Sequence, residues 1–344
     1  MPSTLLLFTR FFVTVSITFL LLLSSVQAEA RSITLMNVSY DPTREFYRDY
    51  NDLFAQWWQQ QTGQRVNFRL SNGGSGTQAR SVTEGLPADV ATLALAYDID
   101  QLHERSQLIP ADWQQRLPYN SAPYTSTVVF LVRSGNPKGI QDWDDLISED
   151  VQVITPNPKT SGGARWNYLT AWAYAEKKYG SKEQARNFVQ QLFARVPVLD
   201  PGARGATNSF VQRGLGDVFL AWENEAFLAM EKLAPGQLEI VLPSLSILAE
   251  PPVTVIDANV DRRGTRAVAE AYLEQLYSDD AQRLIAEHYY RPANPAIAAE
   301  FSDRFPQLQL VTVDDFFGGW QQAQAEHFSN GGVFDQMLQQ IHRR

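Results

Sequence analysis

The chain has 344 residues, a formal net charge of −9 and no cysteine. The acidic charge argues against a nucleic-acid or anionic-membrane binder, and the lack of cysteine excludes disulfides, a lipidated N-terminal cysteine and thiolate chemistry. The hydrophobic fraction of 44% is enough for a buried core, and a chain of this length predicts about two domains.

The N-terminal segment 1–28 is predicted to be a secretory signal peptide. Arg10 is the one charge before the apolar run Phe11–Leu23, and cleavage is expected after Ala28 or, two residues later, after Ala30. A membrane anchor is the alternative, but the run is shorter than the ~20 apolar residues of a spanning helix and is interrupted by hydroxyl side chains. We therefore expect an exported protein located in the periplasm.

Strand-like and helix-like runs alternate along the chain. Residues 33–92 predict strand, helix, strand, helix, strand, which favours an α/β sheet with parallel strands. Residues 118–124 are rich in proline and asparagine and mark a boundary before a strand at 125–132. A second connecting strand is predicted at 247–256 and a helix at 264–290. The pattern therefore indicates two α/β units.

Four predicted turns have the same design, in which a strand-like run is followed by a capped or glycine-rich helix start. The first amides of a helix lack internal partners and the helix dipole makes that end positive, so such a turn can bind an anion. Taken singly, each turn is more simply an ordinary helix start. In α/β sheets, however, ligands bind at the carboxyl ends of strands, where all four turns are expected. The turns are Asp41–Glu45, Gly73–Gly76, Thr155–Trp166 and Pro201–Thr207.

The third turn is the longest of the four. It follows the strand-like run 151–154, and two prolines then block regular structure. Thr160 and Ser161 can cap the helix predicted at 164–178, and Gly162 and Gly163 leave backbone amides uncovered.

With the turns placed, the chain resembles periplasmic sulfate-binding proteins of ATP-driven sulfate importers, from Ile33 to about Gln336. This resemblance implies an α/β fold of type II periplasmic-binding proteins, in which two lobes are joined by two crossing segments and the ligand cleft lies between them. We expect lobe I to comprise residues 29–124 plus 248–344, and lobe II residues 125–247. The resemblance also implies a monomer that delivers sulfate to transmembrane permease subunits. It rests on 37–45, 73–76, 94–98, 157–166, 202–207 and 221–225.

The family's ligand positions, carried over motif by motif, predict a site made only of hydrogen-bond donors. Sulfate accepts hydrogen bonds and donates none, so such a site suits it. We expect the Asp41 carboxylate to turn back and cap its own helix. The implied donors are the Asp41 amide and the Ser75 hydroxyl from lobe I, and from lobe II the amides of Ser161, Gly162, Gly163 and Ala203 and the indole of Trp222.

Other functions fit the sequence less well. Thiosulfate, molybdate or phosphate could replace sulfate as the ligand. A serine hydrolase using Ser75 would need a nearby histidine base, and no histidine lies in the four turns. The pair Tyr289-Tyr290 is similar to iron sites of related folds but lacks a carboxylate–histidine cluster, and the four histidines show no metal spacing. We therefore expect neither an enzyme nor a bound metal or cofactor.

Overall fold

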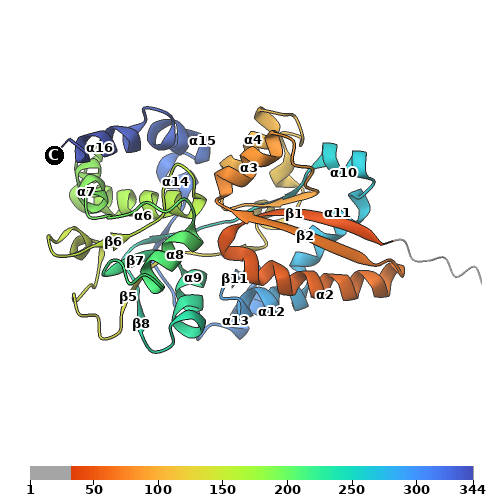
Figure 1. Ribbon diagram of the computed structural model, residues 1–344, viewed down its shortest axis with the longest axis horizontal. Coiled ribbons are helices and arrows are strands. Elements are labelled where there is room, and N and C mark those ends of the chain that lie inside the picture. The colour runs from red at the N-terminus through yellow and green to blue at the C-terminus, as the bar shows by residue number, and fades with distance from the viewer. Residues whose placement is uncertain (1–31, 344) are drawn as a thin grey trace, which may run out of the picture.

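The computed structural model describes residues 32–343, so the predicted signal peptide lies outside the described residues. Two lobes, each built on a four-stranded sheet with helices around it, lie side by side (Figure 1). Within residues 32–343, no helix combines the length and the apolar character needed to cross a membrane. The predicted α/β architecture is therefore confirmed.

The first sheet has the strand order β10-β3-β1-β2, and its β1, β2 and β3 are parallel, as predicted. The register pairs Tyr40 with Gly73, and the preceding Ser39 with Thr92. The carboxyl ends of the three strands therefore lie together, and the turns after them share one edge of the sheet. The strands are β1 (Ile33–Tyr40), β2 (Val66–Gly73), β3 (Val90–Thr92) and the antiparallel β10 (Val253–Val255).

The helices of the first lobe follow the predicted pattern with one interruption. The aromatic face of α2 is buried through Phe46, Tyr50 and Phe54. The helix predicted at 264–290 is two helices, α11 and α12, which are separated by the 3-10 turn η5 (Gln275–Tyr277) and by Ser278, the N-cap of α12. The helices are α2 (Arg44–Thr62), α3 (Ser75–Thr83), α4 (Ala96–Glu104), α10 (Asp257–Arg263), α11 (Arg266–Glu274), α12 (Asp279–Glu287) and α13 (Pro295–Glu300).

The second sheet has the order β6-β7-β5-β8 and is mixed. Its β6 and β7 are parallel, whereas β5 runs antiparallel to both of its neighbours. The alternation of strands and helices in the sequence does not predict the antiparallel direction of β5, because the chain enters this strand from the other lobe. The elements are β5 (Val128–Arg133), β6 (Val153–Ile154), β7 (Val218–Trp222), β8 (Leu238–Val241), α6 (Gly162–Tyr179), α7 (Lys182–Phe193), α8 (Ala203–Val211) and α9 (Glu223–Leu228).

The chain passes between the lobes through short strands. The segment around β4 leads from the first sheet into β5, and the segment after β9 leads back to β10. These are the two expected crossing segments, and they meet at the Ser126–Ala249 bridge. A third segment, ending in β12, lies parallel to β9. The short strands are β4 (Tyr124–Thr125), β9 (Ser246–Ile247), β11 (Arg291–Pro292) and β12 (Leu310–Val311).

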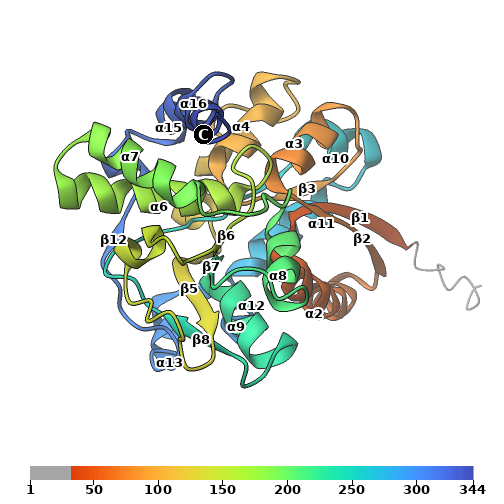
Figure 2. The same cartoon turned by 60° about the vertical axis from the view of Figure 1, so that its left-hand side comes forward.

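The C-terminal helices lie against α6 and α7 of the second sheet, as both ribbon views show (Figures 1 and 2). Phe334 contacts Phe193 with ring centroids 5.1 Å apart, and His327 packs between Tyr168 and Trp172. Residues 313–343 therefore contact α6 and α7, and they also reach α4 of the first lobe, where Gln321 donates to Asp100 and Glu104 at 3.0 Å. The segment contains α14 (Val313–Phe317), α15 (Trp320–Ala323), η6 (Gln324–Phe328) and α16 (Val333–Ile341).

The remaining elements are single turns that complete the connections. They are η1 (Asp41–Thr43), η2 (Trp113–Gln115), α5 (Pro118–Ser121), η3 (Trp143–Ile147), η4 (Ala229–Leu233) and η5 (Gln275–Tyr277).

Candidate functional site

The four predicted turns each start a helix, and they converge where the two lobes face each other. Three helices begin within the predicted turns: α3 at Ser75, α8 at Ala203, and α6 at Gly162, two residues before the predicted start at 164. The first turn forms η1 from Asp41 before α2 begins. The lobes touch here, since the Trp166 indole N–H donates to the Ala94 carbonyl at 2.9 Å. The structure thus presents a closed cleft lined by helix N-termini.

The start of α6 meets the end of β1 across this cleft. The Gly163 amide donates to the Tyr40 hydroxyl at 3.0 Å, and that hydroxyl lies 3.2 Å from the Ser161 Oγ. Ser161 is the N-cap residue, but its hydroxyl makes no capping bond within α6. Burial, as the largest cause, raises the pKa of Tyr40 well above its usual value, so the phenol stays neutral and keeps its proton.

Trp222 ends β7 beside this cluster. Its ring lies edge-on to Tyr40, with centroids 5.2 Å apart, and only 3% of the residue is exposed. The indole Nε1 is buried and has no hydrogen-bond partner within residues 32–343. A Cβ built on Gly163 would lie 3.3 Å from that nitrogen. An unpaired buried N–H costs ~1–3 kcal/mol, so this donor is poised for a ligand acceptor.

Ser75 and Gly162 face each other from opposite lobes. The fully buried Ser75 hydroxyl oxygen accepts from the Ala94 amide at 3.0 Å, so its own proton is free to donate elsewhere. A Cβ on Gly162 would lie 2.4 Å from the Ala94 Cβ and 3.1 Å from the Ser75 Cβ. Glycine is therefore required at 162 for the lobes to close this far.

Asp41 reaches across the cleft instead of capping its own helix, which corrects the prediction. Its Oδ2 accepts from the Arg204 amide at 3.0 Å, in the first turn of α8, and a Cβ on Gly202 would lie 2.6 Å from that oxygen. The second oxygen, Oδ1, is buried without a partner among the described residues. Burial, the largest cause, raises the pKa of the carboxyl to about 6. The neighbouring Ala203, at the first position of α8, is 8% exposed.

The two arginines beside the turns hold the lobes together. Arg165 pairs with Asp98 at 2.9 Å, and both side chains are at most 6% exposed. Arg204 makes two 2.8 Å hydrogen bonds to Glu45 of lobe I and a 3.0 Å one to the buried Glu225 of its own lobe. Because both guanidinium groups already bind carboxylates, they serve as inter-lobe contacts and leave the anion to the neutral donors.

A metal site and a serine nucleophile would each need particular partner side chains around the cleft. No cluster of three metal-ligating side chains is found within the described part of the chain. In the described part of the chain no hydrogen bond joins a histidine to Ser75, whose oxygen accepts from the Ala94 amide. Three of the histidines contact other groups: the Ile109 carbonyl, Asp49 and Tyr168. The arrangement can donate hydrogen bonds to an acceptor through the Ser75 hydroxyl and the Trp222 indole.

Sequence reasoning missed the Tyr40 hydroxyl. Tyr40 lies within the first recognised segment, immediately before Asp41, yet no local signal marks its side chain as part of the site. Its partners Ser161 and Gly163 lie more than a hundred residues away, so only the fold brings them together.

A two-lobed α/β fold with buried donors in the cleft defines a solute-binding protein. The chain belongs to the family of bacterial extracellular solute-binding proteins, whose model matches residues 43–291. It is 57% identical over 324 residues to the sulfate-binding protein of Escherichia coli, covering 94% of this chain and 98% of that one. It is 50% identical over 303 residues to the thiosulfate-binding protein of Pseudomonas aeruginosa, covering 88% and 91%.

A solved structure supports the same assignment. The sulfate-binding protein SubI of Mycobacterium tuberculosis superposes with a TM-score of 0.78 at 32% identity, covering 86% of this chain and 100% of that one. The predicted resemblance to sulfate-binding proteins and the predicted type II periplasmic-binding fold are thereby confirmed.

Proposed function

We propose that this protein is a periplasmic receptor that binds sulfate in the cleft between its lobes and delivers it to an ATP-driven membrane importer. The observation that carries this proposal is the unpaired, buried indole N–H of Trp222 beside helix starts from both lobes. The names of the related sulfate-binding proteins support the choice of ligand.

The proposed ligand set comprises seven donors. Each charge-assisted hydrogen bond contributes ~1.5–3 kcal/mol net, and the sum is reduced by desolvation and by the cost of closing the lobes. Micromolar affinity or better, about −8 kcal/mol, is the expected result. The donors are the amides of Asp41, Ser161, Gly162, Gly163 and Ala203, the Ser75 hydroxyl and the Trp222 indole. Two of these amides have partners in the structure and must exchange them for the ligand: Gly163 donates to the Tyr40 hydroxyl at 3.0 Å and Ser161 to the Asn157 carbonyl at 2.8 Å.

Thiosulfate is the second candidate ligand. It differs from sulfate by one sulfur in place of one oxygen, and a relative at 50% identity is a thiosulfate-binding protein. A donor-only site tolerates this exchange better than a change in protonation, because thiosulfate is also a full acceptor. Molybdate is a weaker candidate because of its size, and phosphate is a weaker candidate because it carries a proton near neutral pH.

The lobes are proposed to close on the ligand. We assign residues 29–124 and 248–344 to lobe I and residues 125–247 to lobe II, and the C-terminal helices of lobe I also pack on α7. Ligands contacted by both lobes favour a closed state. Small-angle scattering should show a smaller radius of gyration with sulfate, and an unchanged radius at saturation would argue against a cleft site.

The cellular role follows from the same family. We infer export by a signal peptide cleaved after Ala28 or Ala30, action as a monomer, docking on permease subunits, and no catalytic activity. The match to solute-binding proteins supports the last point. Incubation with sulfate esters tests it, and turnover would overturn it.

Isothermal titration calorimetry tests the ligand. Sulfate and thiosulfate are titrated into the mature protein, with molybdate as the comparison. Binding of sulfate or thiosulfate at micromolar or lower concentration with one site per chain is expected. Lack of a binding isotherm for both sulfur oxyanions would overturn the proposed function.

A further inference from the structure

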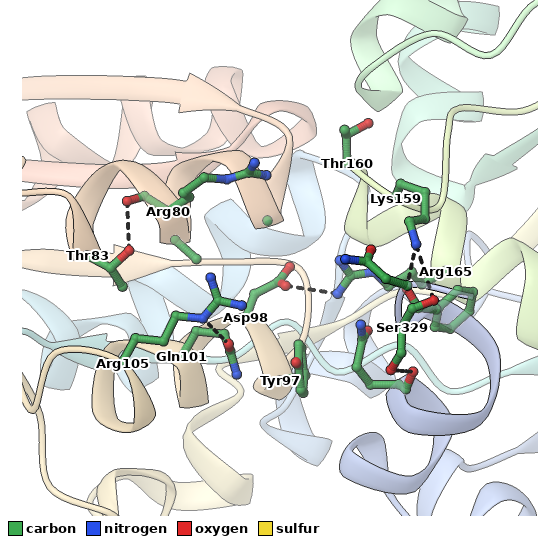
Figure 3. Close-up of a pocket in the computed structure, with 15 residues that line it drawn as sticks. Arg80, Thr83, Tyr97, Asp98, Gln101, Arg105, Lys159, Thr160, Arg165 and Ser329 are labelled. Carbon is green, nitrogen blue, oxygen red and sulfur yellow. Dashed lines mark hydrogen bonds and ion pairs between the residues drawn. The ribbon is translucent and has the colours of Figure 1, made fainter. Parts of the chain in front are cut away.

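A cavity of about 560 Å³ opens beside the proposed sulfate site, at the edge of the cleft. Its walls come from both lobes, with α3 and α4 on one side and the turn before α6 on the other (Figure 3). Two lining residues, Gly76 and Thr160, directly follow and precede the proposed ligands Ser75 and Ser161. The cavity therefore lies next to the proposed ligands Ser75 and Ser161 in the chain, on the side of the cleft that opens to solvent.

Four of the cavity's lining side chains are cationic and one is anionic. Arg165 is paired with that one carboxylate, Asp98, and Lys159 binds Asp335 at 3.1 Å. Arg80 and Arg105 on the lobe I wall are exposed, and neither forms an ion pair with a carboxylate of residues 32–343. Arg105 donates only to the neutral Gln101 amide oxygen, at 2.7 Å.

We propose that this cavity is a cationic vestibule in which Arg80 and Arg105 attract the incoming sulfate and accelerate its binding. The proposal rests on the sulfate-binding function above and assigns to these residues a role in the rate of association. Neither residue belongs to the proposed ligand set.

The physical need for such a vestibule comes from the charge of the chain. A formal net charge of −9 repels a dianion at long range. Salt screens that repulsion over ~8–10 Å, so the charges nearest the cleft decide the field that an approaching sulfate meets. Clefts lined by one sign of charge raise association rates by roughly 10- to 1,000-fold in favourable cases.

The two arginines should affect association far more than dissociation. Once the lobes close, the anion is buried among the proposed ligands. Arg165 and Arg204 are already paired with carboxylates, so the backbone amides stabilise the charge of the bound anion. Arg80 and Arg105 remain outside, on the solvent side. Their interaction with the anion is therefore strongest during approach and is sensitive to ionic strength.

The test compares two double variants by stopped-flow tryptophan fluorescence with sulfate as the probe. Arg80→Gln with Arg105→Gln removes the vestibule charges, and Arg213→Gln with Lys232→Gln removes the same charge from exposed sites after α8 and in η4. At an ionic strength of about 10 mM, the vestibule variant should associate roughly three- to tenfold more slowly than the control variant, with dissociation rates within about twofold. At about 0.5 M salt the association rates should converge.

Two results would overturn the proposal. Equal association rates for the two variants at low salt would show that Arg80 and Arg105 do not steer the anion. A deficit that persists at high salt, or that appears in dissociation, would show that they contact the bound ligand. Failure of the unmodified protein to bind sulfate at all would instead overturn the proposed function itself.

Discussion

The carboxylate of Asp41, in the first lobe, accepts a hydrogen bond from the backbone amide of Arg204, in the second lobe, at 3.0 Å. The two residues are separated by 163 positions in the sequence. Because a carboxylate at a helix N-terminus is stabilised by the free amides and the dipole, Asp41 caps a helix that belongs to the opposite lobe. Lobe closure and the positioning of the α8 amides are thus coupled through one side chain.

Comparing Asp41→Asn with Asp41→Ala isolates this hydrogen bond. Both variants remove the same charge, but asparagine keeps an oxygen for the Arg204 amide. Loss of such a cap costs ~0.5–2 kcal/mol, so the alanine variant should bind sulfate roughly 2- to 30-fold more weakly than the asparagine variant. Calorimetry measures both, and equal affinities would show that the Asp41 cap does not contribute to the bound state.

Trp222→Phe tests the indole as a ligand. The variant keeps the aromatic packing on Tyr40 and removes the unpaired Nε1. Loss of one charge-assisted bond should weaken sulfate binding by ~1.5–3 kcal/mol, roughly 10- to 150-fold. Trp57→Phe, in the partly buried outer part of α2, is the control and should bind normally. An unchanged affinity in a folded Trp222→Phe protein would return Trp222 to a purely structural role.

Gly162→Ala should hold the lobes apart. The added Cβ would meet the Ala94 Cβ at 2.4 Å, and neither backbone can yield without opening the cleft. Overpacking costs ~1–3 kcal/mol, so affinity should fall roughly 5- to 150-fold. Gly76→Ala is the matched control, since its Cβ meets only the ends of Arg165 and Asp98 side chains, at 3.3 Å or more. Scattering should show that only Gly162→Ala fails to contract with sulfate.

His327 should make stability depend on pH. Burial among aromatic rings lowers the pKa of its imidazole from 6.5 to about 4. Between these values the unfolded chain binds a proton that the folded chain does not, so stability is full above pH 6.5 and falls as the pH drops toward 4. This one group should cost about 2 kcal/mol between pH 7.5 and pH 5.

Urea unfolding at both pH values measures this effect, and His327→Gln is the comparison. The variant should lose about 2 kcal/mol less than the parent on acidification, whatever its stability at pH 7.5. The same loss in both proteins would place the acid sensitivity elsewhere, for example at His288, whose pKa burial also lowers.

The sequence predicted the helix starts of the site well because their signals are local. Glycines, caps and a preceding strand act within a few residues, so the turns that start α3 and α6 could be located without the fold, to within about two residues for α6. The reason why residue 162 must be glycine could not be predicted from the sequence, because it depends on how closely Ala94 approaches from the other lobe.

Long-range relationships were the part that pattern reasoning could not supply. The Asp41 carboxylate was expected to bind locally, but closure offers it the free amides of α8 instead. The amphipathic pattern of α16 identifies a helix with one buried face and does not say which layer covers it. Its contacts with α7 depend on the third segment, which returns the chain through β12.

The most direct test of the donor-only cleft is competition between sulfate and phosphate near neutral pH. Phosphate carries at least one proton there, and a site of amides, one hydroxyl and one indole has no strong acceptor for it. Rejection of a mismatched polar partner can reach roughly 10⁴–10⁵-fold, so phosphate should bind at least about a thousandfold more weakly than sulfate. The Asp41 Oδ1, on a residue of the proposed ligand set, is a buried acceptor without a partner among the residues described. Phosphate binding within about tenfold of sulfate would mean that this oxygen accepts the phosphate proton, and would contradict a site that recognises its anion by donors alone.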